Sequence, residues 1–191
     1  LDAVVLLHHS RIETAQTRLD VYERYVACLS CQCARQSRIG ITIDHDVIRL
    51  PLDDRNNGIV PEEYVNIARK IAAADRLVIS APFWDMSFPS ALKVFLENMS
   101  LFNVTFASNE KECYGLCKAE KVLYITTRGM NINTGDDMEQ ATPYIKAIGK
   151  LWGLGELNVV SAQNMDYSTE EQKAEKVNNA IEEGLKLCEE F

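Results

Sequence analysis

The chain has 191 residues, of which 47% are hydrophobic, 25% charged and 8% aromatic, a composition typical of a soluble globular protein with a sizeable core. Its 20 Lys and Arg against 28 Asp and Glu give a formal charge of −8, which disfavours binding to nucleic acid or to an anionic membrane surface. No apolar run approaches the roughly 18 residues of a membrane span, and no basic-then-apolar leader opens the chain. We therefore expect a single cytoplasmic domain over residues 1–191.

The six cysteines are expected to be free thiols, because a chain of this size has enough core to fold without disulfides or metal. Cys28, Cys31 and Cys33 are spaced like metal ligands, but they fall in a predicted helix over residues 19–33. At about 100° per residue, Cys28 points nearly opposite to Cys33, so one metal ion would not easily collect all three. A metal or redox role for this cluster is the minority alternative, and we expect no metal.

Short apolar runs alternate with amphipathic stretches along the chain. Runs typical of strands buried on both faces lie at residues 3–7, 40–44, 77–81, 122–126 and 157–160. Apolar residues at helical spacing predict helices over 19–33, after Pro61, after Pro89, over 141–152, and after a capping box formed by Ser168 and Glu171. The last helix should turn inward the side chains of Ala174, Val177, Ile181, Leu185 and Cys188. Turn-forming residues predict a mobile loop at 50–58.

Five strands alternating with five helices predict a three-layer α/β sandwich, because each right-handed crossover places its helix on the sheet. The first loop lacks both the G-x-G-x-x-G and the G-x-x-x-x-G-K-[ST] motif. A five-stranded parallel sheet in the flavodoxin-like order 2-1-3-4-5, with helices on both faces, fits best. Ligands bind such sheets outside the carboxyl ends of the strands, so the function is expected in the loops that follow strands one, three and four.

The loop after the first strand carries polar residues that run into a helix. Ser10, Thr14 and Gln16 offer hydrogen-bond donors where a helix N-terminus favours a phosphate. From this loop alone, an ordinary capped helix is the favoured alternative.

The loop after the third strand is the most informative part of the sequence. Residues 82–89 read P-F-W-D-M-S-F-P, which gathers three aromatic side chains and a methionine where a polar loop is normal. A proline at each end stiffens the loop, so its backbone groups can face a planar heterocycle that both donates and accepts hydrogen bonds. The alternative is that these aromatic residues plug the sheet end or an oligomer interface. After the fourth strand, Gly129 beside Arg128 would allow a ligand to approach the backbone closely.

Four motifs in the right order resemble one family. Residues 82–93 are similar to P-M-Y-N-F-N-I-P-x-x-L-K, residues 103–106 to G-V-T-F, residues 114–116 to E-G-L, and residues 126–129 to T-S-R-G-G. These motifs are those of the FMN-dependent NADH azoreductases and NAD(P)H:quinone oxidoreductases of the flavodoxin-like superfamily. The resemblance covers about half of the chain, and residues 39–75 carry only the general fold pattern.

The resemblance implies FMN as cofactor, with NADH or NADPH as electron donor and a small-molecule acceptor. It implies that Ser10, Thr14 and Gln16 hold the phosphate. It also implies a homodimer, with Phe106 at the substrate or dimer interface. The remaining cofactor-binding residues that it implies are Pro82, Phe83, Trp84, Asp85 and Met86 around the flavin ring, and Thr127, Arg128 and Gly129 over its far edge. The sequence departs from the family at Asp85 and Ser87, where Asn is usual, and at Met130, where Gly is usual.

The sequence thus predicts an oxidoreductase that passes two electrons from NAD(P)H to quinones, azo or nitro compounds by a ping-pong mechanism. The flavin performs the chemistry, so no catalytic side chain is required. Two alternatives stay open. One is a flavodoxin-type electron carrier or flavin-binding scaffold without turnover, which the acidic charge would suit. The other is an iron–sulfur flavoprotein that uses Cys28, Cys31 and Cys33.

Overall fold

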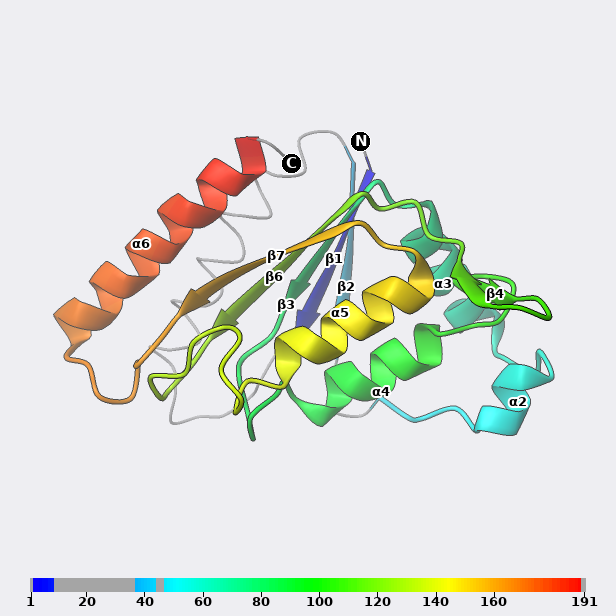
Figure 1. The fold of residues 1–191 in the computed structure, drawn as a ribbon, viewed down its shortest axis with the longest axis horizontal. Helices are drawn as coiled ribbons and strands as arrows, with labels where there is room; N and C mark the ends of the chain where they lie inside the picture. Colours follow the sequence, from blue (N-terminus) through cyan, green and yellow to red (C-terminus); the bar gives the residue numbers. More distant parts are fainter. Residues whose placement is uncertain (1, 9–36, 44–46, 190–191) are drawn as a thin grey trace.

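Figure 1 shows the chain in a computed structural model, which describes residues 2–8, 37–43 and 47–189. A five-stranded parallel sheet with the order β2-β1-β3-β6-β7 forms its centre. The flavodoxin-like α/β class, a parallel sheet with helices packed against it, is confirmed. The strands are β1 (Asp2–His8), β2 (Ser37–Ile43), β3 (Arg76–Ser80), β6 (Lys121–Thr127) and β7 (Glu156–Ala162).

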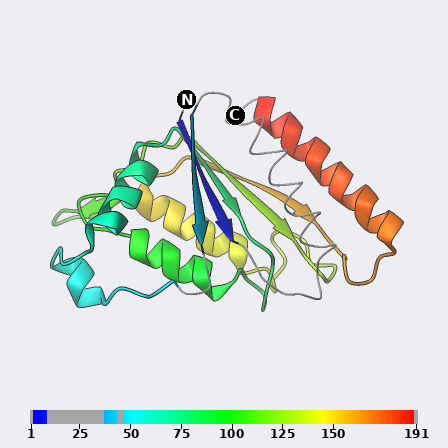
Figure 2. The same cartoon turned by 180° about the vertical axis from the view of Figure 1, so that it is seen from behind.

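The helices pack against the sheet. Figure 1 shows α4 and α5 in front of the strands, and Figure 2, from behind, shows the strands in front of these two helices. None of the described helices combines the length and apolar character needed to cross a membrane. The described helices are α2 (Leu52–Asn56), α3 (Glu62–Ala73), α4 (Ser90–Met99), α5 (Ala141–Trp152) and α6 (Glu170–Glu189).

The core consists of two apolar clusters, one on each face of the sheet. On β3, Leu77 and Ile79 belong to the cluster that includes residues of α3, α4 and α5, whereas Val78 between them belongs to the cluster of α6. On β6, Val122 and Leu123 divide in the same way. Because alternate side chains of a strand point to opposite faces, both faces must be apolar. This burial explains the continuous apolar runs in the sequence.

The end of α5 is fixed by close backbone packing. Gly153 adopts a left-handed conformation with φ 78° at the C-cap of the helix. A Cβ atom on Gly115 would lie 1.9 Å from the backbone nitrogen of Gly153. Glycine at both positions therefore allows the chain before β6 to pass directly under the end of α5.

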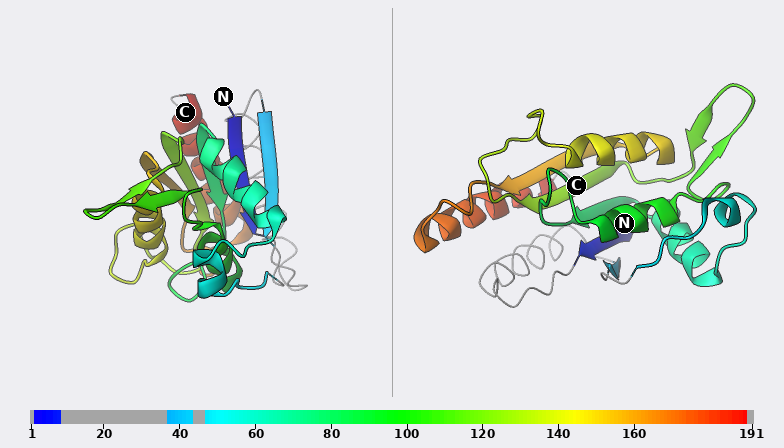
Figure 3. Two further views of the ribbon diagram at one scale, coloured as in Figure 1. Left: turned by 90° about the vertical axis from the view of Figure 1, so that its right-hand side faces the viewer. Right: turned by 90° about the horizontal axis from the view of Figure 1, so that it is seen from below.

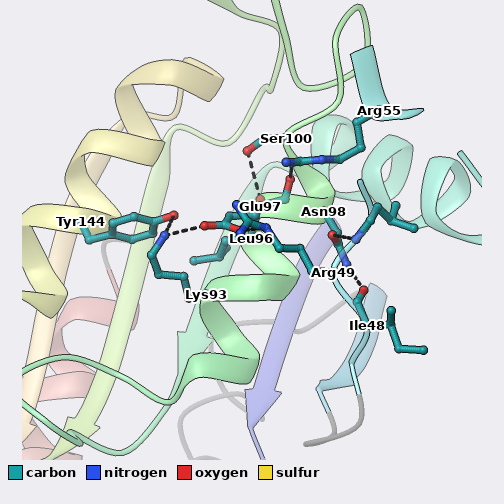
Figure 4. Close-up of polar contacts among 10 residues, drawn as sticks. Ile48, Arg49, Arg55, Lys93, Leu96, Glu97, Asn98, Ser100 and Tyr144 are labelled. Atoms are coloured by element: carbon teal, nitrogen blue, oxygen red, sulfur yellow. Dashed lines mark hydrogen bonds and ion pairs between the residues drawn. The ribbon is translucent and has the colours of Figure 1, made fainter. Parts of the chain in front are cut away.

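The segment after β2 contains the helix α2, where the sequence predicted a loop at 50–58; that prediction is wrong for residues 52–56. Asn98 of α4 is fully buried and binds this segment: its side chain accepts from the backbone N–H of Leu50 at 2.9 Å and donates to the carbonyl of Ile48 at 2.8 Å. The guanidinium of Arg55 donates to a backbone carbonyl of α4 (Figure 4). Contacts with α4, rather than a local pattern, therefore hold α2 in place.

The start of α6 is shifted by one residue from the predicted capping box. Thr169 and Gln172 cap the helix reciprocally, with 3.0 Å from the Thr169 N–H to the Gln172 side-chain oxygen and 3.3 Å from the Gln172 N–H to the Thr169 hydroxyl. The prediction that Ser168 and Glu171 form this box is wrong. Ala174, which was expected to face inward, is exposed.

A short antiparallel hairpin, formed by β4 (Phe106–Ser108) and β5 (Cys113–Gly115), was not predicted. Figure 3 shows the hairpin projecting from the body of the molecule. At its base, Phe106 and Phe102 pack edge to face, with ring centroids 5.8 Å apart, and Phe102 stays 43% exposed. The hairpin thus presents an aromatic pair at the surface.

Candidate functional site

The loop between β3 and α4 forms a tight turn at the carboxyl edge of the sheet. The backbone N–H of Trp84 donates to the carbonyl of Ser87 at 2.9 Å, and the N–H of Ser87 donates back to Trp84 at 2.8 Å. The two residues between them, Asp85 and Met86, have positive φ angles of 47° and 65°. Two successive positive φ angles define a type I′ turn, which favours Asn and Gly and is strained for a residue such as Met.

Three contacts hold this turn in its strained form. The N–H of Phe83 donates to the carbonyl of Thr127, at the end of β6, at 3.1 Å. The N–H of Gln140, just before α5, donates to the carbonyl of Met86 at 2.8 Å. Phe88 is buried against Tyr144 of α5, edge to face, with ring centroids 5.5 Å apart. Strain that neighbours hold in this way is characteristic of ligand-binding loops.

Tyr144 is itself held by α4. The ammonium of Lys93 lies 4.5 Å from the centre of the Tyr144 ring and 3.3 Å from its hydroxyl, and it donates to the carboxylate of Glu97 at 2.6 Å (Figure 4). The hydrogen bond with Glu97 holds the pKa of Lys93 above its usual value, against a smaller effect of burial. The contacts that support the turn therefore extend across both helices.

The turn leaves backbone donors available for a ligand. Among the hydrogen bonds of the described residues, none is donated by the N–H of Asp85 or Met86. The side chain of Asp85 is exposed, while Phe83, Trp84 and Met86 are half-buried. Unpaired N–H groups beside aromatic side chains suit a flat ligand with acceptor atoms on its edge.

The loop after β6 pairs with the loop after β7. The N–H of Arg128 donates to the carbonyl of Ala162 at 2.8 Å, and the carbonyl of Gly129 accepts from the N–H of Asp166 at 2.9 Å. A Cβ atom on Gly129 would lie 2.0 Å from a carboxylate oxygen of Asp166. The sequence suggested that Gly129 permits close approach of a ligand, and the close neighbour in the structure is this carboxylate.

The side chain of Arg128 lies inside the protein, with none of its surface exposed. Its guanidinium donates to the carbonyl of Ile132 and to the hydroxyl of Thr134, both at 2.9 Å, and lies 3.9 Å from the carboxylate of Glu139. It also lies 5.5 Å from the centre of the Phe83 ring. Burial lowers the pKa of Arg128 from its usual value, an effect that the nearby carboxylate of Glu139 opposes. The two terminal nitrogens of this guanidinium are thus directed at protein groups.

Two residues that the sequence did not single out complete this edge. Glu139 is fully buried, and one of its carboxylate oxygens accepts from the first backbone N–H groups of α5, at 3.0 Å from Ala141 and 2.9 Å from Thr142. Gln140 anchors the turn through Met86. An acidic residue directly before a predicted helix is a capping signal, but only the fold shows that Glu139 also faces Arg128.

Exposed apolar side chains rim the same edge of the sheet. Met130 follows β6, Met138 precedes α5 and Tyr167 follows β7, and they are 38%, 53% and 77% exposed. All three belong to loops at the carboxyl ends of strands. Such a rim favours contact with an apolar or aromatic molecule.

Phe106 is not brought to this edge within one chain. The turn precedes the first residue of α4, and the hairpin with Phe106 follows the last residue of the same helix (Figure 1). A helix of 10 residues separates the two by about 15 Å of rise.

Of the remaining predicted site residues, Pro82 is half-buried at the start of the loop after β3, and the others lie outside the described residues. These are Ser10, Thr14 and Gln16 of the expected phosphate loop, together with Cys28, Cys31 and Cys33. Of the described cysteines, Cys113 and Cys117 are free thiols. Within the described ranges, no cluster of three His, Cys, Asp or Glu side chains could hold a metal ion.

Comparison with known proteins gives a consistent result. A family model described as flavodoxin-like fold matches residues 9–185. The chain is 27% identical over 151 residues to FMN-dependent NADH:quinone oxidoreductase 2 of Clostridium acetobutylicum, covering 78% of this chain and 74% of the relative. It is 28% identical over 139 residues to the protein of the same name from Clostridium perfringens strain 13, covering 73% and 67%.

Solved structures show the same fold. An FMN-dependent NADH-azoreductase from Bacillus anthracis, solved in complex with FMN, superposes with a TM-score of 0.77 at 21% identity, over 99% of this chain and 97% of the other. The NAD(P)H:quinone oxidoreductase of Methanothermobacter marburgensis gives a TM-score of 0.72 at 16% identity, over 97% and 98%. The relatives carry the names that the four sequence motifs led us to expect.

Proposed function

The chain belongs to the flavodoxin-like fold family, and we propose that it is an FMN-dependent oxidoreductase that transfers two electrons from NADH or NADPH to quinones, azo or nitro compounds. The observation that carries this proposal is the strained turn of Asp85 and Met86, held by three contacts at the carboxyl edge of a parallel sheet. The names of the curated relatives support both the cofactor and the reaction class.

The described residues fit the isoalloxazine ring of FMN. This ring is planar and has several acceptor atoms on its edge. The turn offers the N–H groups of Asp85 and Met86, which donate to no described residue, beside half-buried aromatic side chains. We assign to the ring site Pro82, Phe83, Trp84, Asp85, Met86, Thr127, Arg128 and Gly129, and to the phosphate Ser10, Thr14 and Gln16.

When bound, FMN supplies the hydride-accepting ring, and the protein supplies position and exclusion of water. The turn would hold the ring edge through its backbone donors, and these keep one geometry because neighbouring residues hold them. Met130, Met138 and Tyr167 provide an apolar rim, which favours aromatic acceptors such as quinones over charged ones.

We further propose that this single domain acts as a homodimer. Ile48, Leu52 and Ile59 are 75%, 60% and 65% exposed, and Phe102 adds an exposed aromatic ring. A second copy would cover such a surface and could bring its own Phe106 to a site that Phe106 does not reach within one chain.

The proposal is tested by steady-state kinetics with NADH and a quinone. If donor and acceptor use the same side of the site, the donor must leave before the acceptor binds, and double-reciprocal plots should be parallel. Intersecting lines would contradict the ping-pong order. A protein that binds FMN but does not oxidise NADH in the presence of a quinone would instead be an electron carrier, the alternative that the net charge of −8 favours.

Two variants locate the chemistry. Trp84→Ala should lower turnover strongly, because it removes a half-buried aromatic side chain from the loop that shapes the ring site. Replacing Cys28, Cys31 and Cys33 together with Ser should leave turnover within about a few fold, since hydride transfer requires reacting atoms about 3–3.5 Å apart at the sheet edge. A folded triple variant that binds FMN but has lost turnover would contradict the assignment.

A further inference from the structure

Three separate parts of the candidate site meet at the guanidinium of Arg128. It faces the ring of Phe83 in the turn after β3, at 5.5 Å from the ring centre. It donates at 2.9 Å to Ile132 and Thr134 in the loop after β6. It lies 3.9 Å from Glu139, whose carboxylate caps α5. No other contact described above joins all three segments.

The pair of Arg128 and Glu139 is poorly arranged as a source of stability. Both side chains have no exposed surface, so both charges lose their hydration. Their separation of 3.9 Å is long for a charge-assisted hydrogen bond. Among the described residues, the buried Nε of Arg128 and the buried Oε2 of Glu139 have no hydrogen-bond partner. Apolar residues of similar volume often stabilise a protein as well as such a pair does, so a role in fixing geometry explains it better.

The loop between Arg128 and Glu139 is itself ordered by local hydrogen bonds. The carboxylate of Asp136 accepts from the backbone N–H of Asn133 at 2.7 Å, and the N–H of Glu139 donates to the carbonyl of Asp136 at 2.9 Å. These hydrogen bonds connect the loop that Arg128 contacts to Glu139, which caps the start of α5.

We propose that Arg128 and Glu139 are positioning residues that hold the turn, the loop after β6 and the start of α5 in the single arrangement that binds the cofactor. This inference rests on the proposed function. Arg128 acts on the ring through Phe83 and through the backbone of its own loop, and its side chain does not contact the cofactor.

Affinity for FMN should report this role. If only a fraction of the molecules has the three segments in the binding arrangement, the apparent Kd rises by the inverse of that fraction. Arg128→Met removes every polar contact of the side chain, and we expect the Kd for FMN to rise about ten-fold or more. Arg128→Lys keeps the charge but loses the planar fork that reaches Ile132 and Thr134 together. Its Kd for FMN should therefore lie between those of wild type and Arg128→Met.

Hydrogen exchange of the apoprotein, read by mass spectrometry, tests the positioning without the cofactor. Arg128→Met should speed exchange in all three segments, 83–88, 129–134 and 140–144, while α3 keeps its wild-type rate. The matched control is Arg76→Met, at the amino end of β3, where Arg76 donates to the carbonyl of Asp75 at 2.8 Å and to Glu120 at 3.4 Å. This control should leave the three segments and the FMN affinity unchanged.

The results separate this inference from the proposed function. Faster exchange confined to 129–134, equal acceleration in α3, or an FMN Kd within about two-fold of wild type in Arg128→Met would overturn the positioning role. If the wild-type protein binds no FMN, the proposed function fails, and the exchange pattern alone decides the positioning. If Arg128→Met does not fold, Glu139→Gln replaces it, because the amide oxygen still caps α5 while the charge is lost. That variant must then loosen the same three segments, or the inference is wrong.

Discussion

Substitution of Gly129 by Ala tests how the loops after β6 and β7 pack. Whether it raises or lowers the free energy of unfolding depends on one neighbour, the carboxylate of Asp166. The new Cβ would lie 2.0, 2.7 and 3.2 Å from the Oδ2, Cγ and Oδ1 atoms of Asp166, its three nearest neighbours. Ordinary contact begins at 3.4 Å, so the carboxylate oxygen must retreat by about 1.4 Å (3.4 − 2.0). Overpacking of this kind costs about 1–3 kcal/mol.

The same substitution should be favourable once the carboxylate is gone. Gly129 does not have a positive φ, so Ala suits its backbone and restricts the unfolded chain, which is worth about 0.4–1 kcal/mol. In an Asp166→Ala background, Gly129→Ala should therefore stabilise the protein. The two positions should show a coupling free energy of about 2 kcal/mol.

Urea denaturation of wild type, both single variants and the double variant measures this coupling. The double-mutant cycle cancels the effect of any other contact that Asp166 makes, because both proteins that carry Asp166→Ala lack that contact. The same destabilisation by Gly129→Ala in both backgrounds would refute the account of how the loops after β6 and β7 meet.

Further predictions concern three single residues, Leu92, Thr169 and Cys117. Leu92→Ala, in the core between α4 and the sheet, should lower the free energy of unfolding by about 2–5 kcal/mol in denaturant titrations. Thr169→Ala should cost about 1 kcal/mol in the same assay, because the N–H of Gln172 loses its cap; no effect would place the start of α6 elsewhere. Burial raises the pKa of Cys117 from 9.0 to about 12, so peptide mapping should show iodoacetamide labelling at exposed Cys113 and little at Cys117 at pH 8. Because the unfolded thiol ionises near pH 9 and the folded one stays protonated up to about 12, wild type should lose stability relative to Cys117→Ala as the pH rises through this window.

The sheet was predictable from the sequence because its physical signature is local. A strand covered on both faces must be apolar at every position, and Val122, Leu123, Tyr124 and Ile125 are all buried. Helix α2 carries no such signature, since its position depends on contacts with α4. The start of α6 was misplaced by one residue because Ser168 with Glu171 and Thr169 with Gln172 fit the same capping pattern.

The candidate site was predictable where its chemistry is contained in one loop. The aromatic residues after β3 indicated a flat ligand. The structure adds that Asp85 and Met86 form a strained turn whose N–H groups donate to no described residue. Glu139 and Gln140 were not predicted because their partners lie in other segments of the chain: Glu139 faces Arg128, and Gln140 donates to Met86. No pattern within the sequence gives the distance between such partners.

Titration of the purified protein with FMN, followed by quenching of flavin fluorescence and by the visible absorption spectrum, tests the central claim most directly. The account predicts saturation at one FMN per chain, a perturbed flavin spectrum on binding and bleaching of the bound flavin by NADH. A protein that leaves both the fluorescence and the spectrum of FMN unchanged at saturating concentrations would contradict it.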